Sequence, residues 1–135
     1  MTSDTLHLGV RVARPAADVY AFASDPRNIP RWAPGLGTSV EEVDGQWYVG
    51  TAEGRARVTF TPPNPYGVLD HEVVTPSGDV VHVPLRVVPD GEDACDVVLT
   101  LRRVPGMTDA ELARDADLVR ADLARLRDLL EGGAG

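Results

Sequence analysis

The hydrophobic and polar positions of the chain change their period twice. In the first segment, Thr5–Val12, Leu6, Leu8 and Val10 share one face and alternate with polar or small residues. This period of two is typical of a half-buried strand.

Two short helices are predicted after this strand. Pro15 favours the first position of a helix, where its missing N–H costs nothing. Asp25-Pro26 repeats the signal, with Asp as N-cap, and the second helix runs to about Trp32 before Pro34-Gly35 ends it. The first helix carries an apolar stripe of Val19, Phe22 and Ala23.

Between Gly37 and Arg103 the period is two again, and turn signals such as Asp44-Gly45 and Ser77-Gly78 separate the runs. Connections this short require antiparallel neighbours, because a parallel crossover needs a dozen or more residues. The predicted strands are Thr38–Val43, Gln46–Glu53, Arg55–Thr61, Gly67–Val74, Asp79–Val88 and Ala94–Arg103.

The C-terminal segment predicts one long helix. Thr108 and Glu111 form a capping box at its start. An apolar stripe follows at spacings of three and four, which indicates a helix of about 23 residues. The stripe fits a coiled-coil seam, but we expect it to cover the sheet, since six half-buried strands need a cover. Its members are Leu112, Ala116, Val119, Leu123, Leu126 and Leu130.

Length and composition indicate one globular domain. The chain has 135 residues, of which 43% are hydrophobic and 25% charged. We place the domain core at about residues 5–131 and expect residues 132–135 to form a flexible tail.

The charge balance excludes some classes of binding partner. The formal net charge is −8 and all 13 basic residues are Arg. Nucleic acids and anionic membrane surfaces both require clustered positive charge, so we expect neither as a partner. A chain without Lys also excludes Schiff-base and P-loop lysine chemistry.

The metal-ligating residues are too few and too scattered for a site. Cys95 is the single cysteine, and His7, His71 and His82 have no metal-ligand spacing, so we expect no metal and no cofactor. Asp93 and Asp96 should raise the pKa of the Cys95 thiol. We find no signal peptide and no apolar run long enough to span a bilayer, and we expect a cytoplasmic protein. The sequence permits a homodimer without determining the oligomeric state.

The chain resembles the SRPBCC superfamily, which contains START-like, Bet v 1-like and polyketide cyclase/dehydrase-like proteins. The resemblance rests on Pro15, Val19-Tyr20-Ala21-Phe22, Asp25-Pro26 and Trp32, together with the order of the predicted elements. It implies an α+β helix-grip fold: a curved seven-stranded antiparallel sheet around the C-terminal helix, with a cavity between them. It implies no catalytic motif.

Strand alternation assigns side chains to that cavity. His71 shares a face with Leu69 and Val73, and it is the one titratable group on the apolar face of a central strand. Alternation sends the neighbouring Asp70 and Glu72 to the other face, which argues against a catalytic cluster. The other cavity candidates are Tyr20, Trp32, Phe60, Val83, Leu85, Leu99, Val119 and Leu123. Trp47 and Tyr48 must face opposite sides of their strand, and the sequence does not decide which lies inside.

Three functions follow from this arrangement. The first is binding of a small hydrophobic or aromatic molecule, with His71 as the polar anchor. The second is a polyketide cyclase/dehydrase-like enzyme in which His71 transfers a proton. The third is an accessory or structural protein with a filled core, in which His71 is a core residue satisfied by a hydrogen bond.

Overall fold

The computed structural model describes residues 5–132. Its strands form two antiparallel sheets, one of order β1-β8-β7 and one of order β2-β3-β4-β5-β6. The α+β class and the antiparallel sheet are confirmed, but the expected single sheet of seven strands is wrong, since there are eight strands in two sheets. The strands are β1 (Thr5–Val12), β2 (Ser39–Val43), β3 (Gln46–Thr51), β4 (Gly54–Phe60), β5 (His71–Val74), β6 (Val80–Val83), β7 (Leu85–Asp90) and β8 (Ala94–Arg102).

The extra strand arises at Pro84, which divides the predicted run Asp79–Val88 into β6 and β7. Proline has no N–H for the ladder and interrupts a strand at this point. The Asp70 carboxylate continues the pairing across the break: it accepts a hydrogen bond from the Leu85 N–H at 3.0 Å and binds the Arg86 guanidinium at 2.6 Å. The chain therefore changes sheets at a polar junction.

The helices begin where the sequence signals predict. Helix α1 (Ala16–Ala23) follows Pro15, and a 3-10 turn, η1 (Pro26–Asn28), leads into α2 (Ile29–Trp32). The Asp25 carboxylate accepts a hydrogen bond from the Arg27 N–H, as expected of an N-cap. Helix α3 (Asp109–Glu131) begins at the Thr108 capping box.

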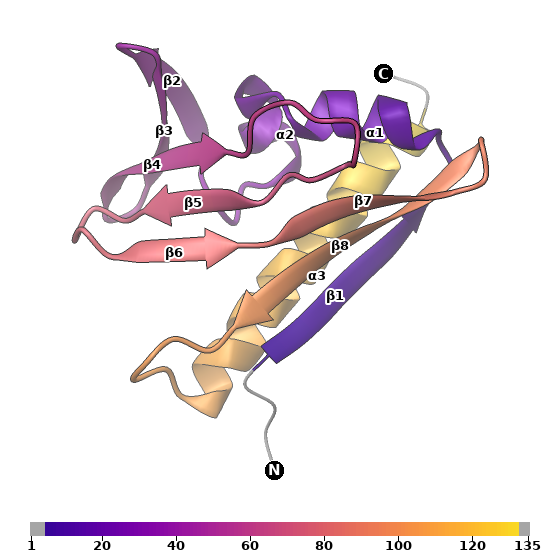
Figure 1. Ribbon diagram of the computed structural model, residues 1–135. Coiled ribbons are helices and arrows are strands. Elements are labelled where there is room, and N and C mark those ends of the chain that lie inside the picture. Colours follow the sequence, from indigo (N-terminus) through magenta and orange to yellow (C-terminus); the bar gives the residue numbers. More distant parts are fainter. Residues whose placement is uncertain (1–4, 133–135) are drawn as a thin grey trace.

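Helix α3 runs behind β7 and β8 and beside β1 (Figure 1), and it contacts β1 and α2. Five of its six predicted stripe residues are buried, and the sixth, Val119, is half-buried. The coiled-coil alternative is not needed to explain the stripe, because the core of the protein covers it. The buried core joins α3 to both sheets and to α1 and α2.

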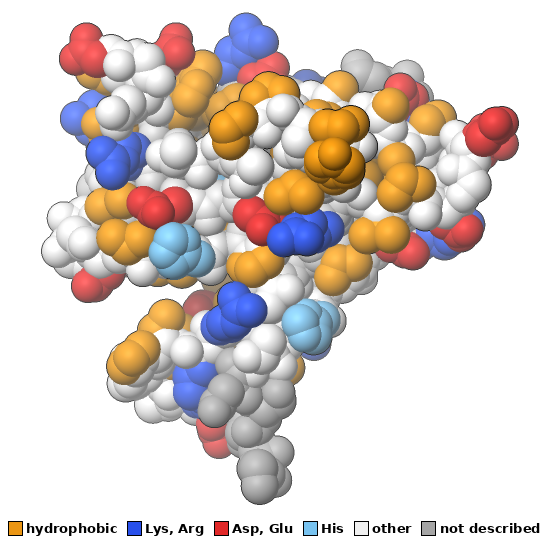
Figure 2. All heavy atoms as spheres, in the orientation of Figure 1, with side chains coloured by type: hydrophobic (Ala, Val, Ile, Leu, Met, Phe, Trp, Pro, Cys, Tyr) orange, Lys and Arg blue, Asp and Glu red, His pale blue; other side chains and the backbone are white. Residues whose placement is uncertain are grey.

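The outer surface carries an apolar patch over the loop between β4 and β5 (Figure 2). Pro62, Pro63, Pro65 and Tyr66 are exposed in this loop, and the Tyr66 side chain is 79% exposed. The Asn64 side chain stabilises the turn, since its Oδ1 accepts hydrogen bonds from the Tyr66 and Val68 N–H groups.

The orientation of β3 is also settled. Trp47 pairs with the buried Val58 and shares a strand face with the buried Val49, so Trp47 lies on the inner face of the sheet. Tyr48 lies on the outer face, where the Arg55 guanidinium stands 4.6 Å from the centre of its ring.

Candidate functional site

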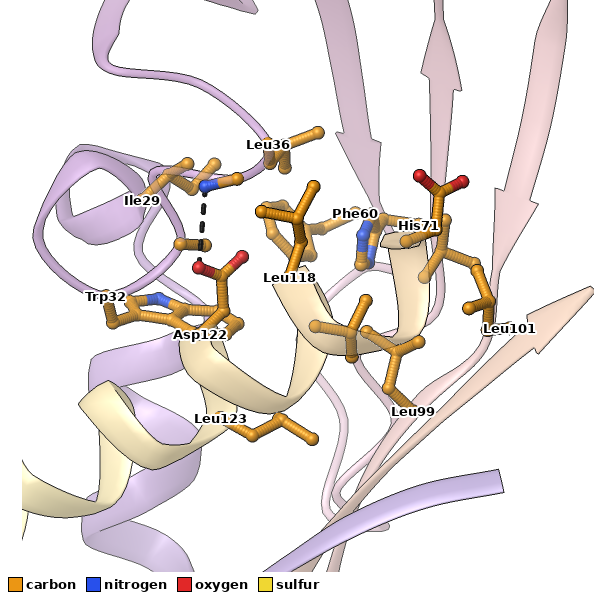
Figure 3. A pocket seen from close by; sticks show the side chains of 15 residues that line it. Ile29, Trp32, Leu36, Phe60, His71, Leu99, Leu101, Leu118, Asp122 and Leu123 are labelled. Carbon is orange, nitrogen blue, oxygen red and sulfur yellow. Dashed lines mark hydrogen bonds between the residues drawn. The ribbon is translucent and has the colours of Figure 1, made fainter. Parts of the chain in front are cut away.

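A cavity of about 270 Å³ lies between the sheets, α2 and α3 (Figure 3). A row of directly paired residues from three strands, Phe60, His71 and Val83, forms part of its wall. Leu118 on α3 is 48% exposed and marks where the cavity opens to the surface. The remaining lining residues are Ile29, Trp32, Ala33, Gly35, Leu36, Leu99, Leu101, Asp115, Val119, Asp122 and Leu123.

His71 is the central polar group of the strand wall. Its Nδ1 lies 3.0 Å from the Leu69 carbonyl oxygen. A carbonyl can only accept, so Nδ1 carries the proton and Nε2 is left as an acceptor. Among the described residues Nε2 has no hydrogen-bond partner. The ring also stands 5.0 Å, centre to centre, from that of Phe60.

Burial lowers the pKa of His71, while the Leu69 carbonyl and Asp70 act weakly in the opposite direction. The imidazole is therefore neutral at pH 7. It presents a basic nitrogen to a largely apolar cavity, which can accept a hydrogen bond or a proton.

Asp122 is the second polar group of the cavity. Its side chain is only 14% exposed, although its neighbours on α3 suggest a solvent-facing position. Oδ1 accepts hydrogen bonds from the Gly35 N–H at 3.4 Å and from Arg125 at 3.2 Å. Burial raises the pKa of Asp122, with the Gly35 and Arg125 contacts opposing the shift.

Seven of the predicted cavity residues line this cavity: Trp32, Phe60, His71, Val83, Leu99, Val119 and Leu123. Val73 shares the strand face of His71, as alternation predicts, whereas Leu69 precedes the strand; both pack in the core and neither lines the cavity. Leu85 is fully buried at the start of β7, against which α1 packs, so it does not reach the cavity.

The prediction for Tyr20 is wrong for this cavity. Its hydroxyl accepts a hydrogen bond from the Asn64 N–H at 3.0 Å and ties α1 to the loop between β4 and β5. Tyr20 lines a separate open groove between α1 and the β3–β4 hairpin, together with Trp47 and several exposed residues. A position off the apolar stripe of α1 gives no information on which neighbour the side chain meets.

Sequence reasoning missed the two carboxylates of α3 that line the cavity, Asp115 and Asp122. One signal was available: they are seven residues apart, two turns on one helix face, with Val119 of the apolar stripe between them. The charge-rich pattern of the helix masked it, since carboxylates beside a stripe usually face water.

The described part of the chain holds no group of three or more His, Cys, Asp or Glu side chains that could bind a metal ion. Burial raises the pKa of the Cys95 thiol, and Asp96 raises it further. The predicted direction is confirmed, although burial rather than charge is the larger cause. No helix among residues 5–132 is long and apolar enough to cross a membrane.

Antiparallel sheets packed against one long C-terminal helix, with a mostly apolar cavity between them, are typical of the START-like class of folds. The chain belongs to the family described as polyketide cyclase / dehydrase and lipid transport, whose model matches residues 5–131. The resemblance to the SRPBCC superfamily is thereby confirmed. No curated protein matches the chain by sequence.

Solved structures show the same fold at low sequence identity. A START superfamily protein from Mycobacterium smegmatis has a TM-score of 0.59 at 18% identity, and the match covers 97% of each chain. The Aha1 dimer from Colwellia psychrerythraea has a TM-score of 0.74 at 14% identity, with 97% of this chain and 98% of that chain covered. The di-domain ARO/CYC protein BexL of the BE-7585A biosynthetic pathway has a TM-score of 0.66 at 21% identity; 96% of this chain matches 47% of BexL.

Proposed function

We propose that this protein binds a small hydrophobic or aromatic molecule in the cavity between its sheets and α3. The observation that carries the proposal is the unpartnered Nε2 of His71 in the wall of a mostly apolar cavity, whose charged lining residues are Asp115 and Asp122. Cavities with few polar groups and many apolar ones are the usual form of small-molecule sites. The volume of about 270 Å³ lies just below the range of roughly 300–1,000 Å³ that is usual for such sites, which favours a small ligand.

Family membership supports the same proposal, since the family description joins lipid transport with cyclase and dehydrase activity. The ligand contacts we propose are those that line the cavity, with His71 accepting a hydrogen bond from a ligand donor. A cytoplasmic location and a homodimer stay predictions from the sequence.

The direct test is native mass spectrometry of freshly purified protein, which detects a ligand that copurifies. Val119→Phe extends a half-buried lining residue into the cavity and should abolish the bound mass. Val88→Phe makes the same change at an exposed residue of β7 and should keep it. A bound mass that survives Val119→Phe would place the ligand outside this cavity.

A second function, proton-transfer catalysis of the cyclase/dehydrase kind, is favoured by one observation. The imidazole of His71 is neutral, its Nδ1 is held by Leu69, and its free Nε2 can act as a general base. Turnover of an aromatic polyketide surrogate, lost by about 100-fold or more in His71→Leu while affinity is kept, would identify an enzyme.

A purely structural role with a filled core is the least supported function. A filled interior would leave no cavity beside His71, whereas the interior holds one of about 270 Å³.

A further inference from the structure

The polar atoms left free on the strand wall and on α3 accept hydrogen bonds. Trp32 Nε1 is the exception in the lining: it is a buried donor without a partner among the described residues. His71 Nε2 has no partner, and neither does Asp122 Oδ2, within the described part of the chain. Asp115 lines the same cavity and forms no hydrogen bond or ion pair with any residue of 5–132. An empty cavity with unpaired acceptors is complemented by a ligand that donates.

Asp122 is held in place by the backbone of the connection between α2 and β2. Its Oδ1 receives both hydrogen bonds, from Gly35 and from Arg125, and the other carboxylate oxygen lies on the side of Leu118 (Figure 3). Gly35 is required for this approach, because a Cβ at that position would lie 2.8 Å from Oδ2. The α2–β2 connection therefore packs closely against both oxygens of this carboxylate, which lines the cavity with Oδ2 free of a hydrogen-bond partner among the described residues.

The charge of the cavity is negative. Asp115 and Asp122 line it, His71 is neutral, and no Arg stands among the lining residues. Arg125 is the one cation bound to Asp122; it is 44% exposed and contacts only Oδ1. Solvent screens such an exposed pair strongly, so it leaves much of the carboxylate charge uncompensated toward the cavity.

The carboxylate of Asp122 is also unfavourable for folding. Its pKa is raised mainly by burial, which means that the ionised form is less stable in the folded protein than in the unfolded chain. Removing the charge while keeping the Gly35 contact should therefore leave stability at neutral pH unchanged or increased. A buried charge that does not stabilise the fold is a candidate for a binding role.

We infer that the ligand of this cavity carries a protonated amine on an apolar or aromatic body, with the ammonium group donating to Asp122 Oδ2. This inference rests on the proposed function and specifies its ligand class. A charge-assisted hydrogen bond at a partly buried site strengthens binding by tenfold or more relative to a neutral donor. A carboxylic acid is disfavoured, because its anion would face two carboxylates and an unprotonated imidazole.

The test uses three naphthalene probes that differ in one polar group: 2-(2-naphthyl)ethylamine, 2-(2-naphthyl)ethanol and 2-naphthylacetic acid. A primary alkylamine is protonated at about pH 7, as a lysine side chain is. Affinities are measured by naphthalene fluorescence and by calorimetry. We expect the amine to bind about tenfold or more tightly than the alcohol, and the acid to bind weakest.

Two variants address Asp122 in different ways. Asp122→Asn removes the charge and keeps an acceptor for Gly35. In this variant the amine and the alcohol should bind with about equal affinity. Gly35→Ala keeps the charge but displaces Oδ2, and it should weaken the amine while the alcohol is little affected. Asp117→Asn is the matched control: Asp117 is exposed on the same helix, pairs with Arg120, and should change nothing. Melting temperatures establish that each variant is folded.

The outcomes separate this inference from the proposed function. Equal binding of amine and alcohol, or an amine preference that survives Asp122→Asn in a folded protein, overturns the amine assignment and leaves cavity binding intact. Failure of all three probes to bind, or binding that is unaffected by Val119→Phe, overturns the proposed function itself.

Discussion

At the scale of single residues, His71 serves the fold and the cavity at once. Its Nδ1–H donates to the Leu69 carbonyl, and the ring lines the cavity with Nε2 free of a partner among the described residues. The sequence presented a core histidine and a ligand contact as alternatives. The structure shows that one ring has both environments, since the two nitrogens of a neutral imidazole differ in role.

His71→Leu should therefore have two effects. It leaves the Leu69 carbonyl without its donor, which costs about 1–3 kcal/mol of unfolding free energy, and it weakens a ligand that donates to Nε2 by about 1–2 kcal/mol. Melting temperature and calorimetric affinity measure the two effects separately. His82→Leu is the control, because His82 lies on β6 with its side chain 73% exposed. An unchanged melting temperature would contradict the role of the Leu69 hydrogen bond.

The lowered pKa of His71 also predicts a pH dependence of stability. In the unfolded chain the imidazole takes up a proton near pH 6.5, whereas burial resists protonation in the folded protein. The unfolded state then binds more protons, so stability falls as pH decreases from about 6.5 toward the folded pKa. Thermal melts across this window should show the decline in the native protein and a flatter profile in His71→Leu. Identical profiles would show that His71 is not buried as described.

At the scale of elements, α3 closes the core and forms one wall of the cavity. Leu123 is 2% exposed and belongs both to the core and to the cavity lining. The same helix carries the exposed Leu118 at the cavity mouth. The helix thus contains a buried leucine and an exposed one, five residues apart, for a direct comparison.

Leu123→Ala should destabilise the protein by about 2–5 kcal/mol, because it removes buried methyl groups and enlarges the adjacent cavity. This is a large part of the 5–15 kcal/mol that typically stabilises a domain, so the melting temperature should fall markedly. Leu118→Ala should have little effect on the melting temperature. A decrease in melting temperature of less than about 2 °C for Leu123→Ala would show that a different face of α3 packs against the core.

At the scale of the whole molecule, one apolar core joins the sheets to the helices. Among the described residues, the most deeply buried side chains are all hydrophobic. Burial of apolar surface is therefore the main source of the folding free energy, and we predict that folding requires no metal ion.

Dialysis against a strong chelator should leave both the melting temperature and the affinity for a naphthalene probe unchanged. The physical reason is the scatter of the metal-ligating side chains, which form no cluster in residues 5–132. A reproducible loss of either quantity, restored by adding a divalent metal, would contradict this prediction.

The sequence by itself determined the features that depend on neighbouring residues. Periodicity placed His71 on the inner face, the capping box at Thr108 fixed the start of α3, and Asp25 capped the turn before α2. Each of these follows from backbone geometry over a few residues, in which side-chain direction repeats every 2 or 3.6 positions. The family resemblance and the α+β class rest on the same local signals.

Only the tertiary structure decided where these faces meet. The predicted strand divides at Pro84, and the carboxylate of Asp70, fourteen residues earlier, accepts the hydrogen bond that bridges the break. Tyr20 reaches Asn64 rather than the cavity, and Asp122 turns inward because Gly35, from a distant segment, offers both an N–H and the space that a side chain would fill. Such contacts join residues far apart in the chain, and their geometry is set by the packing of whole elements, which local periodicity does not record.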